Sequence, residues 1–316
     1  MSLPLTLHGE SVLLVASCLG DGDTGGGLLY HDGQSWICID DVSTTGLFVS
    51  DNELIRILWA PSQVADGTSI LHYNTSGLLR HLTVDGLTDP HDVLWDGVHY
   101  VAASSSQDSL LWIGLEGDVV RRFQPACGDD CWHLNSLFLH EGVLYATAFG
   151  RFEEPRGWVG RQRDGTGIVF RVDTGEDVQT GLCCPHSPRF ESNRWIVCNS
   201  TNSELKAFSV TGELVKSVGL RDWVRGLAIS DRYQLVGESV NRQLGDEVRG
   251  ATVAVLDRCT WTVLQRLTLP FREIYDLVLV SPELLGAVLG SPNVRSIVPC
   301  PPQIPVGAAG LSTRGA

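Results

Sequence analysis

Three of the nine histidines stand at similar places in short segments of the chain that resemble one another. His91 and His186 each lie nine residues before an aromatic residue, and His133 stands two residues before Asn135 in a segment with looser spacing. Imidazoles that converge from separate strands can bind a divalent metal ion and leave one position open for water or substrate. They can equally form a metal-free acid–base centre, because histidine titrates near neutral pH.

Other polar residues occupy the matching place in the remaining segments. Arg225 is predicted to clamp a substrate carboxylate or phosphate through its two-pronged guanidinium, or alternatively to satisfy backbone carbonyls. Tyr275, Asp276 and Asn135 are predicted to be polar partners in catalysis. Arg189, three residues farther into its strand than His186, is expected to point away from the others and to stabilise a turn.

The segments that carry these residues form an internal repeat. Each contains an apolar strand, a polar turn and a second apolar strand, which is the pattern of a β-hairpin. The six copies cover residues 44–60, 90–106, 133–150, 185–201, 224–239 and 274–290. Their starts are 39 to 52 residues apart, and almost no helical periodicity occurs between them. This spacing is typical of β-propeller blades of about four strands each.

We therefore predict an all-β protein with a six-bladed propeller, in which each copy forms the two inner strands of a blade. The residues before Thr44 either complete the last blade or begin a seventh. Residues 1–300 are predicted to be a single propeller domain, followed by a flexible tail at 301–316 that is rich in Pro, Gly and Ala. Because the inner strands of a propeller start at one mouth of a central channel, the matching residues should meet there.

Composition restricts the class of partner. The chain has 316 residues, with 23 Lys and Arg against 37 Asp and Glu and a net charge of −14. Nucleic acids and anionic membranes require basic surfaces, so neither is an expected partner. Nine scattered cysteines and an N-terminus without a basic, apolar leader favour a reducing cytoplasm with mostly free thiols.

Several motifs along the chain resemble those of a bacterial family of uncharacterised conserved hypothetical proteins that share a domain of unknown function. The motifs are HLN (133–135), PHSPR (185–189), RGLA (225–228) and VGES (236–239), and the resemblance covers roughly residues 90–245. The chain differs from the family pattern at Ser136, where glycine is usual, and at one residue of VGES. The resemblance implies a propeller-like fold and supplies no activity.

These observations predict an enzyme with a divalent metal ion at His91, His133 and His186. Its substrate would be a small polar or anionic molecule, and the reaction could be that of a lyase, a hydrolase or an oxygenase. The alternative is a non-catalytic propeller scaffold that binds a protein partner or a ligand.

Overall fold

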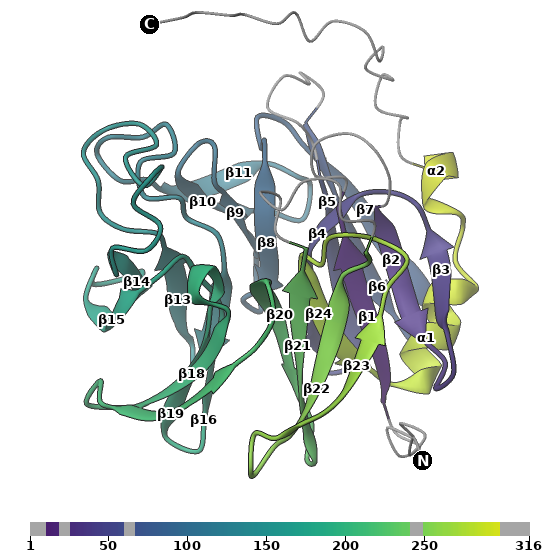
Figure 1. The fold of residues 1–316 in the computed structure, drawn as a ribbon. Helices are drawn as coiled ribbons and strands as arrows, with labels where there is room; N and C mark the ends of the chain where they lie inside the picture. Colours follow the sequence, from purple (N-terminus) through teal and green to yellow (C-terminus); the bar gives the residue numbers. More distant parts are fainter. Residues whose placement is uncertain (1–10, 19–25, 60–66, 241–248, 298–316) are drawn as a thin grey trace, which may run out of the picture.

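The computed structural model describes residues 11–18, 26–59, 67–240 and 249–297. This part of the chain forms six four-stranded antiparallel sheets in a ring, as Figure 1 shows. The prediction of a six-bladed β-propeller is confirmed, and the described residues contain no seventh sheet. The predicted tail at 301–316 lies outside the described residues.

Each blade runs from an innermost strand at the channel to an outermost strand at the rim. The innermost strands are β4 (Thr44–Ser50), β8 (Pro90–Trp95), β12 (Leu137–His140), β16 (Pro185–Glu191), β20 (Trp223–Ile229) and β24 (Asp276–Val280). The second strands are β1 (Val12–Ser17), β5 (Glu53–Leu58), β9 (Tyr100–Ser104), β13 (Val143–Ala148), β17 (Arg194–Asn199) and β21 (Tyr233–Ser239). The third strands are β2 (Gly27–His31), β6 (Thr68–Asn74), β10 (Ser109–Ile113), β14 (Gly167–Arg171), β18 (Glu204–Ser209) and β22 (Thr252–Asp257). The outermost strands are β3 (Trp36–Asp40), β7 (Gly77–Val84), β11 (Val119–Phe123), β15 (Asp177–Leu182), β19 (Leu214–Gly219) and β23 (Val263–Thr268). All six innermost strands start at or close to the start of a predicted copy.

The ring is closed by pairing the first and the last strand of the described chain. Strand β24, the innermost strand of the last blade, pairs antiparallel with β1, so that Val278 lies opposite Leu14. Strands β2 and β3 complete that blade. The residues before Thr44 therefore complete the sixth blade, which was the first of the two predicted alternatives.

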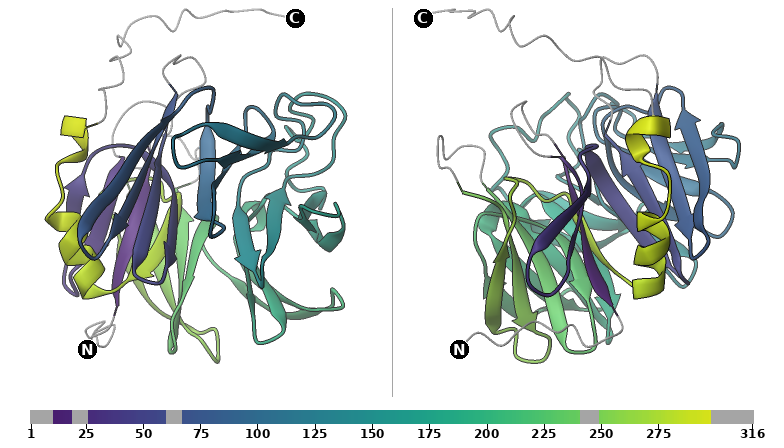
Figure 2. Two further views of the ribbon diagram at one scale, coloured as in Figure 1. Left: turned by 180° about the vertical axis from the view of Figure 1, so that it is seen from behind. Right: turned by 90° about the vertical axis from the view of Figure 1, so that its right-hand side faces the viewer.

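One predicted strand is a helix. The second half of the sixth copy was expected to be a strand, but it forms α1 (Pro282–Leu289). Ser281 caps this helix by accepting a hydrogen bond from the Leu284 backbone N–H, and Pro282 occupies the first turn, where its missing N–H is not needed. The blade takes its second strand from β1 instead, and the buried face of α1 packs beside β6 and β7 (Figure 2).

The core consists of apolar clusters between neighbouring blades. One of them joins Ile57 of β5 and Ile70 of β6 to Val93 of β8 and Leu111 of β10, all of them buried. Besides α1, the described helical segments are α2 (Val294–Ile297) and a short 3-10 turn at Ser200–Asn202. None of the helices in the described ranges is long and apolar enough to cross a bilayer.

Candidate active site at the mouth of the channel

Bulges at the start of the inner strands aim side chains into the channel mouth. The pairing of β8 with β9 skips His91, and the pairing of β20 with β21 skips Gly226. A bulge leaves one residue out of the ladder and redirects its neighbourhood. Gly226 has a φ of +75°, and an added Cβ would lie 3.2 Å from the Asp276 Cα. The glycine of the RGLA motif is therefore required for two inner strands to approach each other.

The structure brings most of the predicted site residues to one small cavity at this mouth. The cavity is lined by His91, Asn135, His186, Arg225, Tyr275 and Asp276, and also by Asp92, Ser136, Ser187 and Arg189. Only about 10 Å3 is open to the centre of a water molecule, which is close to the space that one water requires.

The three histidines are near one another but not equally so. The rings of His91 and His133 meet edge to face, with their centroids 5.3 Å apart. His186 contacts Phe149 at 5.6 Å, and Phe149 lies 4.2 Å from His133 on its other side. Phe149, which the sequence reasoning did not select, therefore contacts two of the predicted metal ligands.

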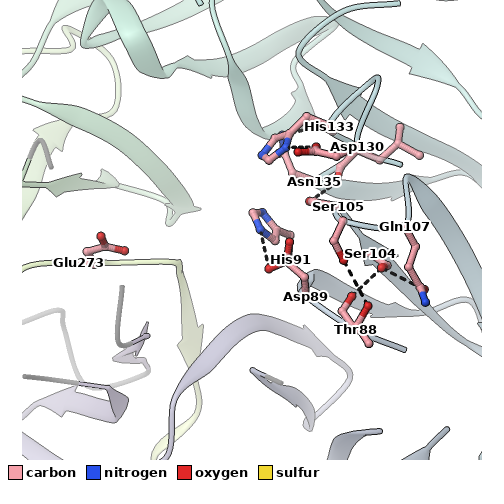
Figure 3. Close-up of polar contacts among 12 residues, drawn as sticks. Thr88, Asp89, His91, Ser104, Ser105, Gln107, Asp130, His133, Asn135 and Glu273 are labelled. Carbon is pink, nitrogen blue, oxygen red and sulfur yellow. Dashed lines mark hydrogen bonds and ion pairs between the residues drawn. The ribbon is translucent and has the colours of Figure 1, made fainter. Parts of the chain in front are cut away.

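Each imidazole has one nitrogen fixed by the protein. His133 Nδ1 lies 2.6 Å from Asp130 Oδ1, and His91 Nε2 lies 3.5 Å from Asp89 Oδ1, as Figure 3 shows. His186 Nδ1 lies 2.7 Å from Ser200 Oγ. These acceptors favour a proton on the fixed nitrogen and leave the lone pair on the other one.

Burial keeps two of the imidazoles neutral. It is the largest cause lowering the pKa of His186 well below its ordinary value, and the positive charge of Arg225 adds to the effect. Burial also lowers the pKa of His133, although the Asp130 carboxylate opposes this shift. Burial is the largest single influence on Asp89 and raises its pKa, but the charge and hydrogen bond of His91, the charge of His133 and a hydrogen bond from Trp59 together bring it down to about 2.

The imidazoles are not arranged around a single metal position. A zinc ion bound at about 2.0–2.1 Å by three nitrogens would hold them only a few Å apart. Within the described residues, the only group of three ligand atoms that all lie within 4.8 Å of one another is Asp108, Cys127 and Cys131. Cys127 and Cys131 form a disulfide in this structure. Binding of a metal by the three histidines would therefore require their side chains to rotate.

Arg225 is held in place by the three residues that directly precede β24. Its Nε donates to the Ile274 carbonyl, its Nη2 donates to Glu273 at 2.9 Å, and its guanidinium lies 3.6 Å from the centre of the Tyr275 ring. The sequence predicted that Arg225 would either clamp an anion or satisfy backbone carbonyls. Arg225 lines the cavity and also donates to a backbone carbonyl, so its position is compatible with both roles. Glu273 offsets part of its charge, and the sequence pattern gave no sign of this partner.

The inner end of the cavity is formed by two buried aspartates that join neighbouring blades. Asp92 accepts hydrogen bonds from the N–H groups of Val93 and Leu137, and Asp276 accepts them from those of Leu47 and Leu277. Their matching contacts show that Asp276 is equivalent to Asp92, which leaves Tyr275 as the equivalent of His91. Asp276 is thus placed to hold blades together.

Asn135 and Arg189 lie in positions that the sequence did not predict. Asn135 is buried. Its Oδ1 accepts hydrogen bonds from the hydroxyls of Ser136 and Thr147, and its Nδ2 donates to the His133 carbonyl, so Asn135 fixes the loop that carries His133. The expectation that Arg189 points away was wrong, because Arg189 lines the cavity beside Asp92 and Asp276.

The carboxylates that orient the histidines could have been found only by their proximity in sequence. Asp89 is two residues before His91, and Asp130 is three residues before His133. Trp158, from the long connection between β13 and β14, donates its Nε1–H to Asp130 and packs 4.5 Å from His133. The connections between strands vary from blade to blade, so an alignment of the repeats does not predict where a residue such as Trp158 lies.

The fold and this mouth define a class: a six-bladed β-propeller with a histidine-lined polar site where its inner strands begin. Residues 38–284 match the family model described as "Domain of unknown function (DUF4915)", and the chain belongs to that family. No curated protein matches the sequence.

Solved structures with the same architecture are distant in sequence. A chain of a nidogen/laminin complex is 12% identical, with a TM-score of 0.60, over 86% of this chain and 98% of that one. A "putative 6-phosphogluconolactonase" from Bacteroides fragilis is 15% identical, with a TM-score of 0.58, over 88% and 100%. A protein of unknown function from Bacteroides caccae is 12% identical, with a TM-score of 0.59, over 86% and 99%. At these identities the likeness supports the fold alone.

Proposed function

We propose that the protein is a hydrolase that opens a small anionic ester or lactone at the histidine-lined mouth. The observation that carries this proposal is the meeting of two Asp–His pairs, Asp89–His91 and Asp130–His133, whose imidazoles are 5.3 Å apart. The name of the Bacteroides fragilis neighbour is consistent with lactone hydrolysis but carries no residue-level argument.

The two pairs suit complementary proton transfers. His133 is neutral, and Asp130 fixes the proton on Nδ1, so the Nε2 lone pair can accept a proton from attacking water. An ionised Asp89 stabilises His91 when the ring is charged, so His91 can donate a proton to the departing oxygen. Arg225 lines the small cavity together with His91 and supplies positive charge toward an anionic substrate there. His133 does not line this cavity but contacts the ring of His91.

The test is hydrolysis of a panel of lactones and esters, including gluconolactone and its 6-phosphate, followed by pH-stat. We expect turnover of at least one anionic member, and a 10²- to 10⁴-fold loss of kcat in His133→Gln, as is usual for a lost general base. His99→Gln, in the β8–β9 turn, is the control and should stay within twofold. No turnover above the blank, or equal rates in both variants, would contradict the proposal.

A divalent metal ion at His91, His133 and His186 is a second candidate for this site. The pattern that favours it is the fixed second nitrogen of each imidazole, since metal-bound histidines commonly donate their other N–H to the protein. Near-stoichiometric metal in the purified protein that disappears in the His91→Ala/His186→Ala double variant would support it. A protein with neither metal nor turnover would favour the non-catalytic scaffold.

A further inference from the structure

A second, larger cavity lies beyond Asp92, Asp276 and Arg189, on the side away from the histidines. Its volume is about 700 Å3, within the range of small-molecule sites. All six innermost strands contribute to its wall, and it extends to the β4–β5 and β8–β9 turns. The four steps along the chain from Asp92 to Asp96 give it a depth of about 13 Å. We call it the lower chamber.

About half of the exposed surface of the lower chamber is apolar. Phe48, Leu139, Ile229 and Leu279 line it, and each keeps part of its side-chain surface exposed. Apolar surface that faces water inside a channel would gain free energy if an apolar ligand covered it.

The closed end of the lower chamber carries its only cationic side chain, Arg189. The guanidinium donates one hydrogen bond, from Nη1 to the Pro188 carbonyl at 2.9 Å, and forms no ion pair with any carboxylate of the described chain. An arginine has five N–H donors, so most of them have no acceptor among the residues that the structure describes. A planar carboxylate is the group that such a fork binds best.

The nearby acids do not occupy Arg189. Asp92 and Asp276 use their oxygens on backbone N–H groups of neighbouring strands. Burial raises the pKa of Asp276 to about 6 and raises that of Asp92 well above its ordinary value, which reduces the negative charge beside the guanidinium at mildly acidic pH.

Acidic residues at the other end give the chamber a direction. Asp51, Glu53 and Asp96 lie at the turns that border it. They disfavour an anionic group at that end, while Arg189 favours one at the closed end.

We propose that the lower chamber binds a small carboxylic acid with an apolar body, its carboxylate paired with Arg189 and its body against the apolar wall. This site shares Asp92, Arg189 and Asp276 with the small cavity at the mouth. It does not use the histidines, so it does not depend on the proposed hydrolysis. The ligand class follows from one cationic anchor at the end of a chamber whose wall is partly apolar.

Calorimetric titration at pH 6 with octanoate and with octylamine tests the proposal on the unmodified protein. The two probes share an apolar body and differ in the charge of the head group. We expect one octanoate per chain and at least tenfold weaker binding of octylamine. Equal affinity for both probes, or no binding of octanoate, would overturn the proposal.

A matched pair of variants tests the anchor. Arg189→Met keeps a long apolar side chain and removes the charge, and we expect it to weaken octanoate binding by at least tenfold, the usual effect of losing a charged hydrogen bond. Arg194→Met, at an exposed position of β17 in the same blade, should bind octanoate as the unmodified protein does. Unchanged binding in a folded Arg189→Met protein would also overturn the proposal.

Discussion

The protonation of single histidines depends on the carboxylates beside them. Asp130 accepts from His133 Nδ1 and from Trp158 Nε1, so one carboxylate fixes both the tautomer and the aromatic wall of the ring. The backbone of His133 itself has a φ of +52°, a value that residues other than glycine rarely adopt. The site thus depends on residues that the fold holds in an unfavourable conformation.

Replacing Asp130 with Asn should move the titration of His133 to lower pH. The Asp130 carboxylate stabilises the imidazolium, whereas burial opposes it, so loss of the negative charge leaves burial unopposed. Histidine NMR titration of the variant measures the shift. Asp129→Asn, at an exposed neighbouring position, is the control and should leave the His133 titration in place. A titration at the same pH in Asp130→Asn would show that the pair does not act as proposed.

Asp276→Asn should change how stability depends on pH. The pKa of Asp276 is raised from 3.8 to about 6 in the folded protein, mainly by burial. A raised carboxyl pKa contributes stability at low pH, which is lost as the pH rises through the folded-state pKa. Between pH 4.5 and 7.5 the free energy of unfolding of the unmodified protein should fall by about 2 kcal/mol relative to that of the variant.

Urea unfolding at both pH values measures this difference. Asp231→Asn, at a fully exposed site, should follow the unmodified protein at both pH values. If the Asp276→Asn and unmodified curves run parallel with pH, the buried carboxyl does not titrate in this range.

Equivalent positions in the repeat identified residues at the mouth but not their partners. Counting from the second strand placed His91, His186 and Arg225 correctly because each precedes the same hairpin. It could not reveal Glu273 or Phe149, since their contacts form only when the blades close into a ring. Arg189 was misplaced for a local reason: the pairing of β16 and β17 shifts register between His186 and Arg189, which changes the direction of the side chain.

At the level of elements, the departure from the repeat is α1. Its sequence is apolar like the second strands of the other copies, and alternation alone could not separate the two. The distinguishing signal was Ser281-Pro282-Glu283, which supplies a cap, a first-turn proline and an acid at the helix N-terminus. Leu284, which is fully buried, then packs into the cluster that contains Tyr73 of β6.

The cap of α1 should be worth about 1 kcal/mol, the usual effect of removing an N-cap serine. Ser281→Ala removes the acceptor for the Leu284 N–H and should lower the free energy of unfolding by this amount. Chemical denaturation measures it. Ser76→Ala, at an exposed turn residue, should change stability by less than about 0.5 kcal/mol. Equal effects of the two substitutions would mean that α1 does not need its cap.

At the level of the whole molecule, closure makes each blade depend on the next. The last sheet contains the first and the last strand of the described chain, and Asp92 and Asp276 add hydrogen bonds from one inner strand to another. The sequence indicated the number of blades through its repeat. It left the closure open because the pairing of β24 with β1 joins segments about 260 residues apart, which periodicity cannot register.

Weakening the closure should therefore destabilise the entire ring. Leu14 of β1 is fully buried opposite Val278 of β24, and Leu14→Ala should cost about 2–5 kcal/mol, as expected for a large-to-small change in a packed core. Leu264→Ala on β23, where the side chain is 55% exposed, should cost less than about 0.5 kcal/mol. Denaturant unfolding gives both values.

Amide exchange should further show faster opening of the blades on both sides of the closing sheet in Leu14→Ala, because the inner strands β20 and β4 both contact β24. Faster exchange confined to β1, β2, β3 and β24 would instead mean that the blades open independently and that closure does not couple them.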